Sequence, residues 1–119
     1  YMLVIIESPF RGNKNFGQEQ NSVYARLCLF DSLMRGESPF ASHLLYTQVL
    51  NEQDLSQRTM GMKRAFKWYR HANLMAVYGD HGITQGMRKG IRVAKYYNIK
   101  IEHRSLSDWA KSVEQGKMR

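Results

Sequence analysis

The sequence predicts one small α/β domain built on a parallel sheet with helices on both faces. Two stretches, residues 2–6 and 74–78, are apolar at successive positions, which is typical of strands buried on both sides. Stretches with helical spacing separate the expected strands, and connections of that length allow the right-handed crossovers of a parallel sheet. The 119 residues fit one domain of common size. We therefore assign residues 1–119 to one doubly wound, Rossmann-like domain.

The first half of the chain is expected to run from a strand through a polar loop into a long helix. Pro9 ends the strand, because proline cannot continue a hydrogen-bonded ladder. Apolar residues at helical spacing predict a helix over residues 22–35, and Gly36 follows where a C-terminal cap belongs. A short second strand, or the exit from one, is expected at residues 38–43, and a short helix at 44–50.

The second half alternates helices and strands. Its expected elements are, in order, a helix at 57–71, a strand at 74–78, a helix at 84–97, a strand at 99–103 and a last helix at about 106–115. Met62, Phe66 and Tyr69 form one apolar stripe on the first of these helices. Thr84 is a candidate N-cap of the second, and residues 105–108 resemble a capping box that opens the last.

Composition limits the classes of partner. The formal net charge is +8, from 18 Lys and Arg against 10 Asp and Glu. This excess favours an anionic partner, either a phosphorylated small molecule or a nucleic acid; a solvated basic surface is the alternative. No apolar run approaches the roughly 20 residues of a membrane span, and the single Cys28 suits the reducing cytoplasm. No Cys/His spacing indicates a structural metal site, and no cofactor is expected.

Three loops are candidates for a ligand site, because parallel α/β sheets bind ligands beyond the carboxyl ends of their strands. The first loop, residues 8–12, combines a serine hydroxyl, an arginine fork and a glycine, which together suit a phosphate or a ribose. An ordinary turn is the alternative, and no Walker pattern follows. The predicted contacts from this loop are Ser8, Pro9, Phe10, Arg11 and Gly12.

The other two loops add further candidates. At residues 79–87 a strand leads into a helix whose free N–H groups attract anions. Asp80 is a candidate to bind a sugar hydroxyl there; alternatively, Asp80 and Thr84 only satisfy the turn and the helix cap. In the third loop, His43 is a candidate to bind phosphate or transfer a proton, and Tyr46 to stack on a base. The alternative for His43 is a structural role.

Taken together, five short segments resemble the nucleoside 2-deoxyribosyltransferase-like superfamily. They are Ser8 to Gly12, Asn21 with Tyr24 to Arg26, Pro39 to Tyr46, Trp68 with Ala72 and Asn73, and Gly82 to Met87. Their order and spacing are most similar to small phage and bacterial proteins with such a domain. The resemblance implies a flavodoxin-like sheet, a nucleoside or nucleotide ligand, and assembly into dimers or larger oligomers. It also adds to the predicted ligand contacts Tyr24, Gly86, Met87 and Arg88.

The sequence departs from that superfamily at both catalytic positions. Its enzymes cleave the N-glycosidic bond of deoxynucleosides with a glutamate nucleophile and a second acid, but Arg88 and Ala65 stand at those places. An arginine cannot attack an anomeric carbon and an alanine cannot move a proton, so no catalytic residue is assigned. An arginine would also make the pocket more cationic, which suits a ligand with several phosphates.

These departures favour a protein that binds a nucleotide, or a cyclic-nucleotide-like signal, without turning it over. A phage-encoded sponge that sequesters a host immune signal in the host cytoplasm would fit. The alternative is an N-glycosidase or deoxyribosyltransferase whose acid has moved to Glu7, Asp80 or Glu37. A nucleic-acid-binding module ranks third, and its motivation is the basic run from Lys63 to Arg70, which otherwise forms a solvated helix face.

Overall fold

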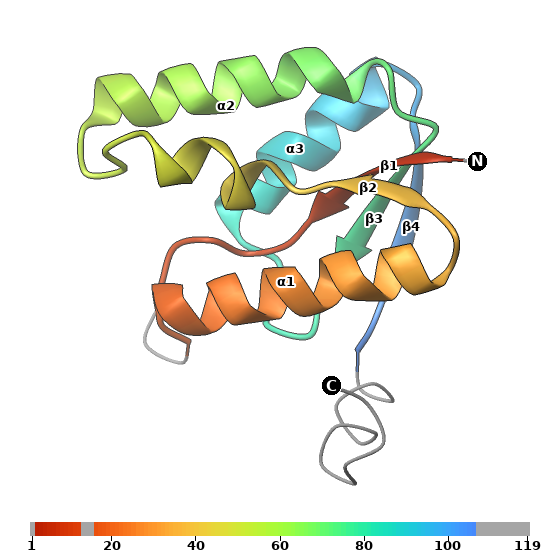
Figure 1. Ribbon diagram of the computed structural model, residues 1–119. Helices are drawn as coiled ribbons and strands as arrows, with labels where there is room; N and C mark the ends of the chain where they lie inside the picture. Colours follow the sequence, from red (N-terminus) through yellow and green to blue (C-terminus); the bar gives the residue numbers. More distant parts are fainter. Residues whose placement is uncertain (1, 13–15, 107–119) are drawn as a thin grey trace, which may run out of the picture.

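The computed structural model describes residues 2–12 and 16–106 (Figure 1). Its elements are, in chain order, β1 (Leu3–Glu7), α1 (Gln18–Met34), β2 (Ser38–Phe40), two short 3-10 helices (Ser42–Leu44 and Tyr46–Gln48), α2 (Leu55–Tyr69), β3 (Leu74–Tyr78), α3 (Gln85–Tyr96) and β4 (Lys100–Arg104). The expected last helix at 106–115 falls, apart from Leu106, outside the described residues.

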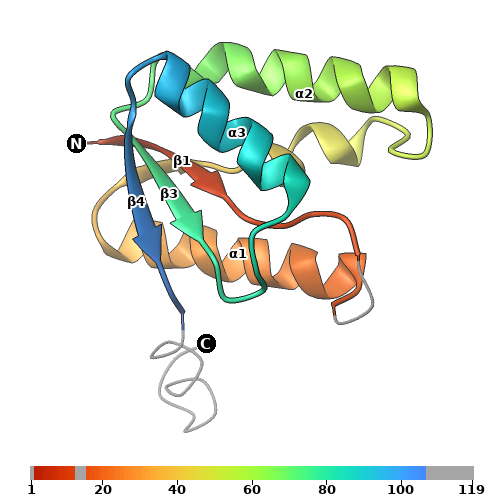
Figure 2. The same cartoon turned by 180° about the vertical axis from the view of Figure 1, so that it is seen from behind.

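The strands form one parallel sheet in the order β2-β1-β3-β4. The chain runs outward from β1 to β2 and then returns past β1 to β3, so the strand order reverses between β1 and β3. Helix α1 covers one face of the sheet, while α2 and α3 cover the other (Figure 1, Figure 2). The predicted α/β fold, with a parallel sheet and helices on both faces, is confirmed. The point of reversal is where such sheets place their ligand sites.

The core consists of two apolar clusters, one on each face of the sheet. On the α1 face, Val4 and Ile6 of β1 pack with Cys28 of α1. On the opposite face, Met75 and Val77 of β3 pack with residues of α2 and α3. Every residue of β3 is buried, as expected for a strand covered on both sides. Packing on both faces holds the sheet between its helices and so positions the loops at its carboxyl edge.

The end expected for α1 and both ends expected for α3 are supported by caps. The Thr84 hydroxyl accepts a hydrogen bond from the Met87 N–H at 3.2 Å and thereby starts α3. Gly36, just after α1, has a φ of 82°, and Asn98, just after α3, has a φ of 57°. Glycine and asparagine enter this left-handed region more readily than other residues, which is why they end these helices.

Other expected bounds differ from the structure: α2 spans Leu55–Tyr69 instead of 57–71, β2 ends at Phe40 instead of 43, and β4 spans Lys100–Arg104 instead of 99–103. Helix α1 begins at Gln18, before the expected start at Ser22. The prediction missed these first residues because they are polar and exposed and show no apolar periodicity. The Gln20 side chain supports this turn by accepting a hydrogen bond from the Gly17 N–H at 2.7 Å. Residues 44–50, expected as one short helix, lie instead across two single 3-10 turns.

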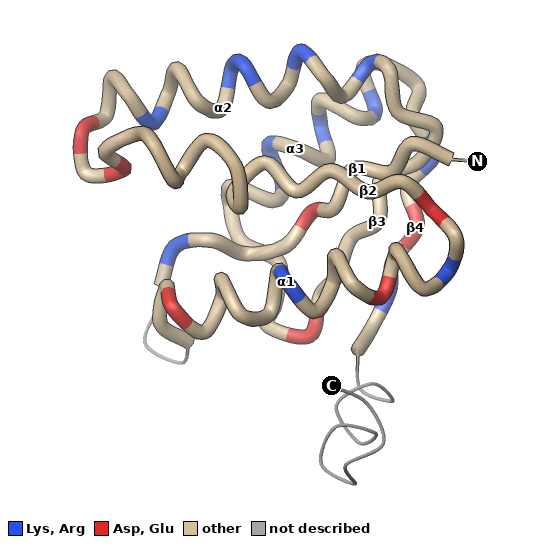
Figure 3. Tube along the Cα trace, viewed as in Figure 1, with Lys and Arg blue, Asp and Glu red and all other residues tan. Residues whose placement is uncertain are grey.

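Charge is distributed unevenly over the two faces of the sheet. Helices α2 and α3 each carry four Lys and Arg and no Asp or Glu, whereas α1 carries two acidic residues, Glu19 and Asp31, and one basic residue, Arg26. Figure 3 shows the basic residues along α2 and α3, on the same side of the sheet. The predicted basic residues of α2 and its C-cap are exposed, as on a solvated helix face; they are Lys63, Arg64, Lys67 and Arg70. In the described part of the chain, no helix has the length and apolar character to cross a membrane.

Candidate functional site

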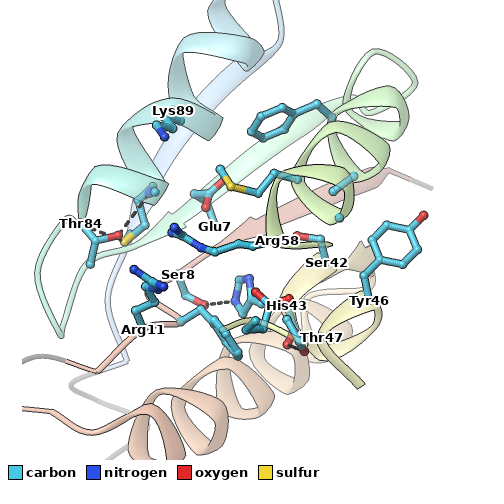
Figure 4. A pocket seen from close by; sticks show the side chains of 18 of the residues that line it. Glu7, Ser8, Arg11, Ser42, His43, Tyr46, Thr47, Arg58, Thr84 and Lys89 are labelled. Atoms are coloured by element: carbon cyan, nitrogen blue, oxygen red, sulfur yellow. Dashed lines mark hydrogen bonds between the residues drawn. The ribbon is translucent and has the colours of Figure 1, made fainter. Parts of the chain in front are cut away.

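A cavity of about 310 Å³ lies between the carboxyl end of β1 and the amino end of α3 (Figure 4). Its walls come from the loop after β1, the two 3-10 helices between β2 and α2 (residues 42–48, here called the 3-10 segment), α2 and the first turns of α3. This is the edge of the sheet at which the strand order reverses, the place predicted for a ligand site.

Most of the predicted ligand contacts line this cavity. They are Ser8, Phe10, Arg11, His43, Tyr46, Thr84, Gly86 and Met87. Five predicted contacts are not among the lining residues, namely Pro9, Gly12, Tyr24, Asp80 and Arg88. Arg88 is exposed on α3, and its neighbour Lys89 lines the cavity instead. Successive helix residues point about 100° apart, so a shift of one position decides which side chain faces the site.

Pro9 and Gly12 position the first loop rather than line the cavity. Pro9 is fully buried. A Cβ on Gly12 would lie 2.9 Å from the backbone nitrogen of Gln18, so glycine allows the loop to pass close to the start of α1. The side-chain amide of Asn21 donates a hydrogen bond to the carbonyl oxygen of Arg11 at 2.9 Å. These contacts fasten the loop to α1 and leave the Arg11 side chain to project from a fixed backbone.

Asp80 and Tyr24 bind each other outside the cavity. The Tyr24 hydroxyl donates to Asp80 Oδ2 at 3.0 Å and accepts from the Asp80 N–H at 2.9 Å. Asp80 Oδ2 also accepts from the N–H of Leu106 at 2.6 Å. The carboxylate therefore ties α1 to the chain that leaves β4. These contacts give Asp80 a structural role, although it links distant segments rather than satisfying the turn and the helix cap expected above.

Ser8 and His43 form a hydrogen-bonded pair on one wall of the cavity (Figure 4). Their Oγ and Nε2 atoms lie 2.7 Å apart. Burial lowers the pKa of His43 to about 4, so the imidazole is uncharged at neutral pH. It can hold the Ser8 hydroxyl through this hydrogen bond, but it brings no positive charge for a phosphate.

Positive groups converge on one end of the cavity. Arg11 comes from the loop after β1, Arg58 from α2 and Lys89 from α3, and Figure 4 shows all three on the side where α3 begins. Gln85 and Gly86, in the first turn of α3, also line the cavity. The first N–H groups of a helix have no intrahelical acceptor. Arginine forks and free N–H groups are common partners of phosphate oxygens.

The cavity also has apolar walls. Helix α2 contributes Met62, Ala65 and Phe66 to its lining. Tyr46 lies with Ser42 and Thr47 on the side away from the start of α3 (Figure 4). The indole Nε1 of Trp68 donates a hydrogen bond to the Tyr46 hydroxyl at 3.0 Å and steadies that ring. Ala65 is buried in the wall, so the position compared above with a second acid carries no carboxyl. Apolar and aromatic surface of this kind suits a flat ring.

Glu7, the last residue of β1, is a lining residue that the predicted ligand contacts did not include. Its side chain is buried, and the Tyr69 hydroxyl donates a hydrogen bond to Oε2 at 3.0 Å. Burial raises the pKa of Glu7 to about 8, although the hydrogen bond from Tyr69 lowers it. Gly90 of α3 packs so closely that a Cβ there would overlap the carboxyl group. In the sequence, the one feature that marks Glu7 is that it is an acidic residue at the end of an otherwise apolar strand.

Sequence reasoning also missed the contribution of α2. Arg58, Met62, Ala65 and Tyr69 recur at helical spacing on one face, and all of them line the cavity. In the sequence, the apolar stripe of Met62, Phe66 and Tyr69 has the pattern of a helix face that packs on the core. The charged Arg58 on the same face is the one feature that indicates a ligand site instead. The remaining lining residues outside the prediction are Ser42, Thr47, Glu52, Gly61, Gln85 and Lys89.

Comparison with protein-family models matches residues 2–104 to one family, described as a domain of unknown function (DUF7768). The match includes every strand and helix described above. No curated protein matches the chain. Among residues 2–12 and 16–106, no group of three or more His, Cys, Asp or Glu is arranged to hold a metal ion.

Proposed function

The chain belongs to the DUF7768 family, a domain of unknown function, and from the chemistry of its site we propose that it binds a nucleotide or a nucleotide-derived molecule. The observation that carries the proposal is that one cavity combines three cationic side chains, Arg11, Arg58 and Lys89, with apolar and aromatic lining residues. A nucleotide combines the matching groups, anionic phosphates and a flat base. The cavity volume of about 310 Å³ lies near the lower limit of small-molecule sites, about 300–1,000 Å³.

The charge balance of the cavity favours an anion. The cavity contains three cationic residues, Arg11, Arg58 and Lys89, and two acidic residues, Glu52 and Glu7. Burial raises the pKa of Glu7 to about 8, so Glu7 is largely protonated at neutral pH. Two of the surrounding helices, α2 and α3, contribute no acidic residue. In a partly enclosed site with a low effective dielectric, such an excess of positive charge attracts phosphates more strongly than it would in open water. The phosphates would lie at the start of α3 and the base toward Tyr46.

We propose retention of the ligand rather than turnover. At the two positions compared with catalytic acids, Ala65 has no titrating group and Arg88 does not line the cavity. A protein that holds a nucleotide-derived signal intact has the chemistry of a sponge. A phage-encoded protein that sequesters a host immune signal in the host cytoplasm is the biological role that fits this chemistry, and assembly into dimers or larger oligomers is part of the same proposal.

Calorimetric titration tests the binding function. The ligands are nucleoside mono-, di- and triphosphates, cyclic dinucleotides and the corresponding nucleosides, and the proteins are the wild type, Arg58→Ala and the matched control Arg64→Ala, an exposed charge on the same helix. We expect phosphorylated ligands to bind more tightly than nucleosides. Losing one charge-assisted hydrogen bond costs about 1.5–3 kcal/mol, so Arg58→Ala should weaken binding about 10- to 150-fold, and Arg64→Ala should not. Absence of binding by every phosphorylated ligand would refute the proposal.

A second candidate function, cleavage of an N-glycosidic bond, is favoured by the position of Glu7. Of the three acids considered as substitutes, Asp80 is engaged by Tyr24 and Leu106, and Glu37 pairs with Arg104 at 2.6 Å. Glu7 alone of the three lines the cavity. A carboxyl that is protonated at neutral pH is suited to protonate a leaving base.

Chromatography of nucleotides after incubation with the protein separates the two functions. Free base released by the wild type, but not by Glu7→Gln, would establish cleavage and refute retention. Intact ligand recovered after heat release from both proteins would establish retention and exclude the second candidate.

A further inference from the structure

We propose that Glu7 meets the ligand as a neutral carboxylic acid and donates a hydrogen bond to an uncharged acceptor atom, such as a carbonyl oxygen, a ring nitrogen or a hydroxyl oxygen. Glu7 would then determine specificity, since it would select ligands that carry such an acceptor in addition to phosphate. This inference rests on the proposed function, because it assigns a role to one residue of the same cavity.

The surroundings of Glu7 provide no positive partner at close range. The side chain is 6% exposed, and no ion pair in the described part of the chain includes it. Its hydrogen-bond partner there is the uncharged hydroxyl of Tyr69. On the side of α3, the carboxyl packs against Gly90, which offers only backbone. A buried carboxylate with one neutral donor is poorly compensated for the loss of water and therefore takes up a proton.

The charged and titratable groups around Glu7 come from each element that lines the cavity. Helix α2 contributes Tyr69 and Arg58, α3 contributes Lys89, and the loop after β1 contributes Arg11. The 3-10 segment contributes His43, which is neutral at neutral pH. None of the three cations reaches ion-pair distance of Glu7, so they attract an anion in the cavity without ionising the carboxyl.

The Tyr69 hydroxyl bonds to one of the two carboxyl oxygens of Glu7, Oε2. We therefore assign the acid proton to the other oxygen, Oε1. A carboxylic acid has one O–H donor, and a buried donor without an acceptor is costly. Because Glu7 lines the cavity, a bound ligand is the natural source of that acceptor.

The pH dependence of binding follows from this assignment. The pKa of about 8 leaves about nine-tenths of Glu7 protonated at pH 7. Above pH 8 the carboxyl loses its donor and gains a negative charge in the cavity that holds the phosphates. Affinity for a ligand that uses the acid proton should therefore fall about tenfold for each pH unit above 8.

The test uses 5′-nucleoside monophosphates as ligands that contain uncharged acceptors, and pyrophosphate as a ligand without a base or sugar. Affinities for the nucleoside monophosphates are measured by calorimetry from pH 7.0 to 9.5, above the second ionisation of a phosphate monoester near pH 6. Pyrophosphate, which loses its last proton within this range, is compared between the proteins at pH 7 only. Glu7→Gln is the diagnostic variant, because its neutral amide keeps a donor and an acceptor in nearly the same places. Glu52→Gln, the same substitution at another acid of the cavity, is the matched control.

We expect the wild type and Glu52→Gln to lose affinity for the nucleoside monophosphates above pH 8, and Glu7→Gln to bind them with constant affinity. Pyrophosphate should bind the wild type and Glu7→Gln equally at pH 7. A wild-type affinity that does not change from pH 7.0 to 9.5 would overturn the inference, and so would an equal loss for both ligands in Glu7→Gln.

Carbon NMR of the protein labelled in glutamate side chains measures the protonation of Glu7 without ligand. A Glu7 carboxyl resonance that titrates below pH 6 overturns the inference even if nucleotides bind. A resonance that titrates near pH 8, combined with no binding of any probe, instead refutes the proposed binding function and with it the role assigned to Glu7 in recognition. The two failures are thus distinguishable.

Discussion

Replacing Glu7 by glutamine should change how the stability of the protein depends on pH. In the unfolded chain the carboxyl has its ordinary pKa of 4.5, whereas burial raises the pKa in the folded protein to about 8. Between these values the folded protein holds a proton that the unfolded chain has released. Protonation therefore favours the folded state, and stability falls as the pH rises, by about 1.4 kcal/mol for each pH unit.

The interval between the two pKa values, 4.5 and about 8, corresponds to about 5 kcal/mol of stability. This contribution is fully present below pH 4.5 and is lost as the pH rises through 8. The change is large compared with the total stability of a small domain, about 5–15 kcal/mol. Glu7→Gln keeps an acceptor for the Tyr69 hydroxyl but has no titrating group, so the variant should lack this part of the slope.

Urea unfolding followed by circular dichroism at pH 5, 6, 7 and 8 measures the effect. The free energy of unfolding of the wild type, relative to that of Glu7→Gln, should fall by about 4 kcal/mol from pH 5 to pH 8. Glu52→Gln, whose side chain is less deeply buried, should follow the wild type. Parallel curves for the wild type and Glu7→Gln would refute the reasoning that the buried carboxyl holds a proton.

Three further substitutions test the packing and the ion pairs around the site. Gly90→Ala puts a Cβ against the Glu7 carboxyl and should cost about 1–3 kcal/mol in urea unfolding at pH 7. In the wild type the Glu37 carboxylate lies 2.6 Å from the buried guanidinium of Arg104. Arg104→Ala removes this partner and should cost about 3–5 kcal/mol, measured as a lower Tm. Thr84→Ala removes the side-chain cap of α3 and should cost about 1 kcal/mol by the same measurement.

Each of these variants has a matched control. A Cβ at Gly86 would make only an ordinary contact, so Gly86→Ala should not destabilise α3. Arg35→Ala breaks an exposed ion pair and should cost less than about 1 kcal/mol. Thr59→Ala, at an exposed position inside α2, should be nearly neutral. A control that costs as much as its partner variant would contradict the packing, ion-pair or capping role assigned above.

The architecture was predictable where a pattern repeats within one element. Strand β3 was predicted with its observed bounds, because five successive apolar residues can only be accommodated under helices on both sides. The start of α3 was predicted from Thr84, whose cap is a local interaction with Met87. The start of α1 was not, because its exposed first turn shows no apolar periodicity and is held by a side-chain contact.

The candidate site was predictable at the level of loops, but not of individual contacts. Parallel topology brings Ser8, Arg11 and Thr84 to one edge of the sheet, and they line one cavity. The role of Glu7 depends on Tyr69 and Gly90, which are distant in sequence and meet it only in the folded chain. No local pattern distinguishes such an acid from an ordinary strand end.

The separation of charge across the sheet has a consequence for the speed of ligand capture. Helices α2 and α3 are basic and contain no acidic residue, whereas α1 contains two, so the positive charge of the helices lies mainly on one side of the sheet. An approaching anion is drawn toward the side on which the cavity lies, so the association rate rises above that of an undirected encounter and falls as salt is added. For the sponge function proposed above, a fast encounter with the signal would be as useful as a slow release.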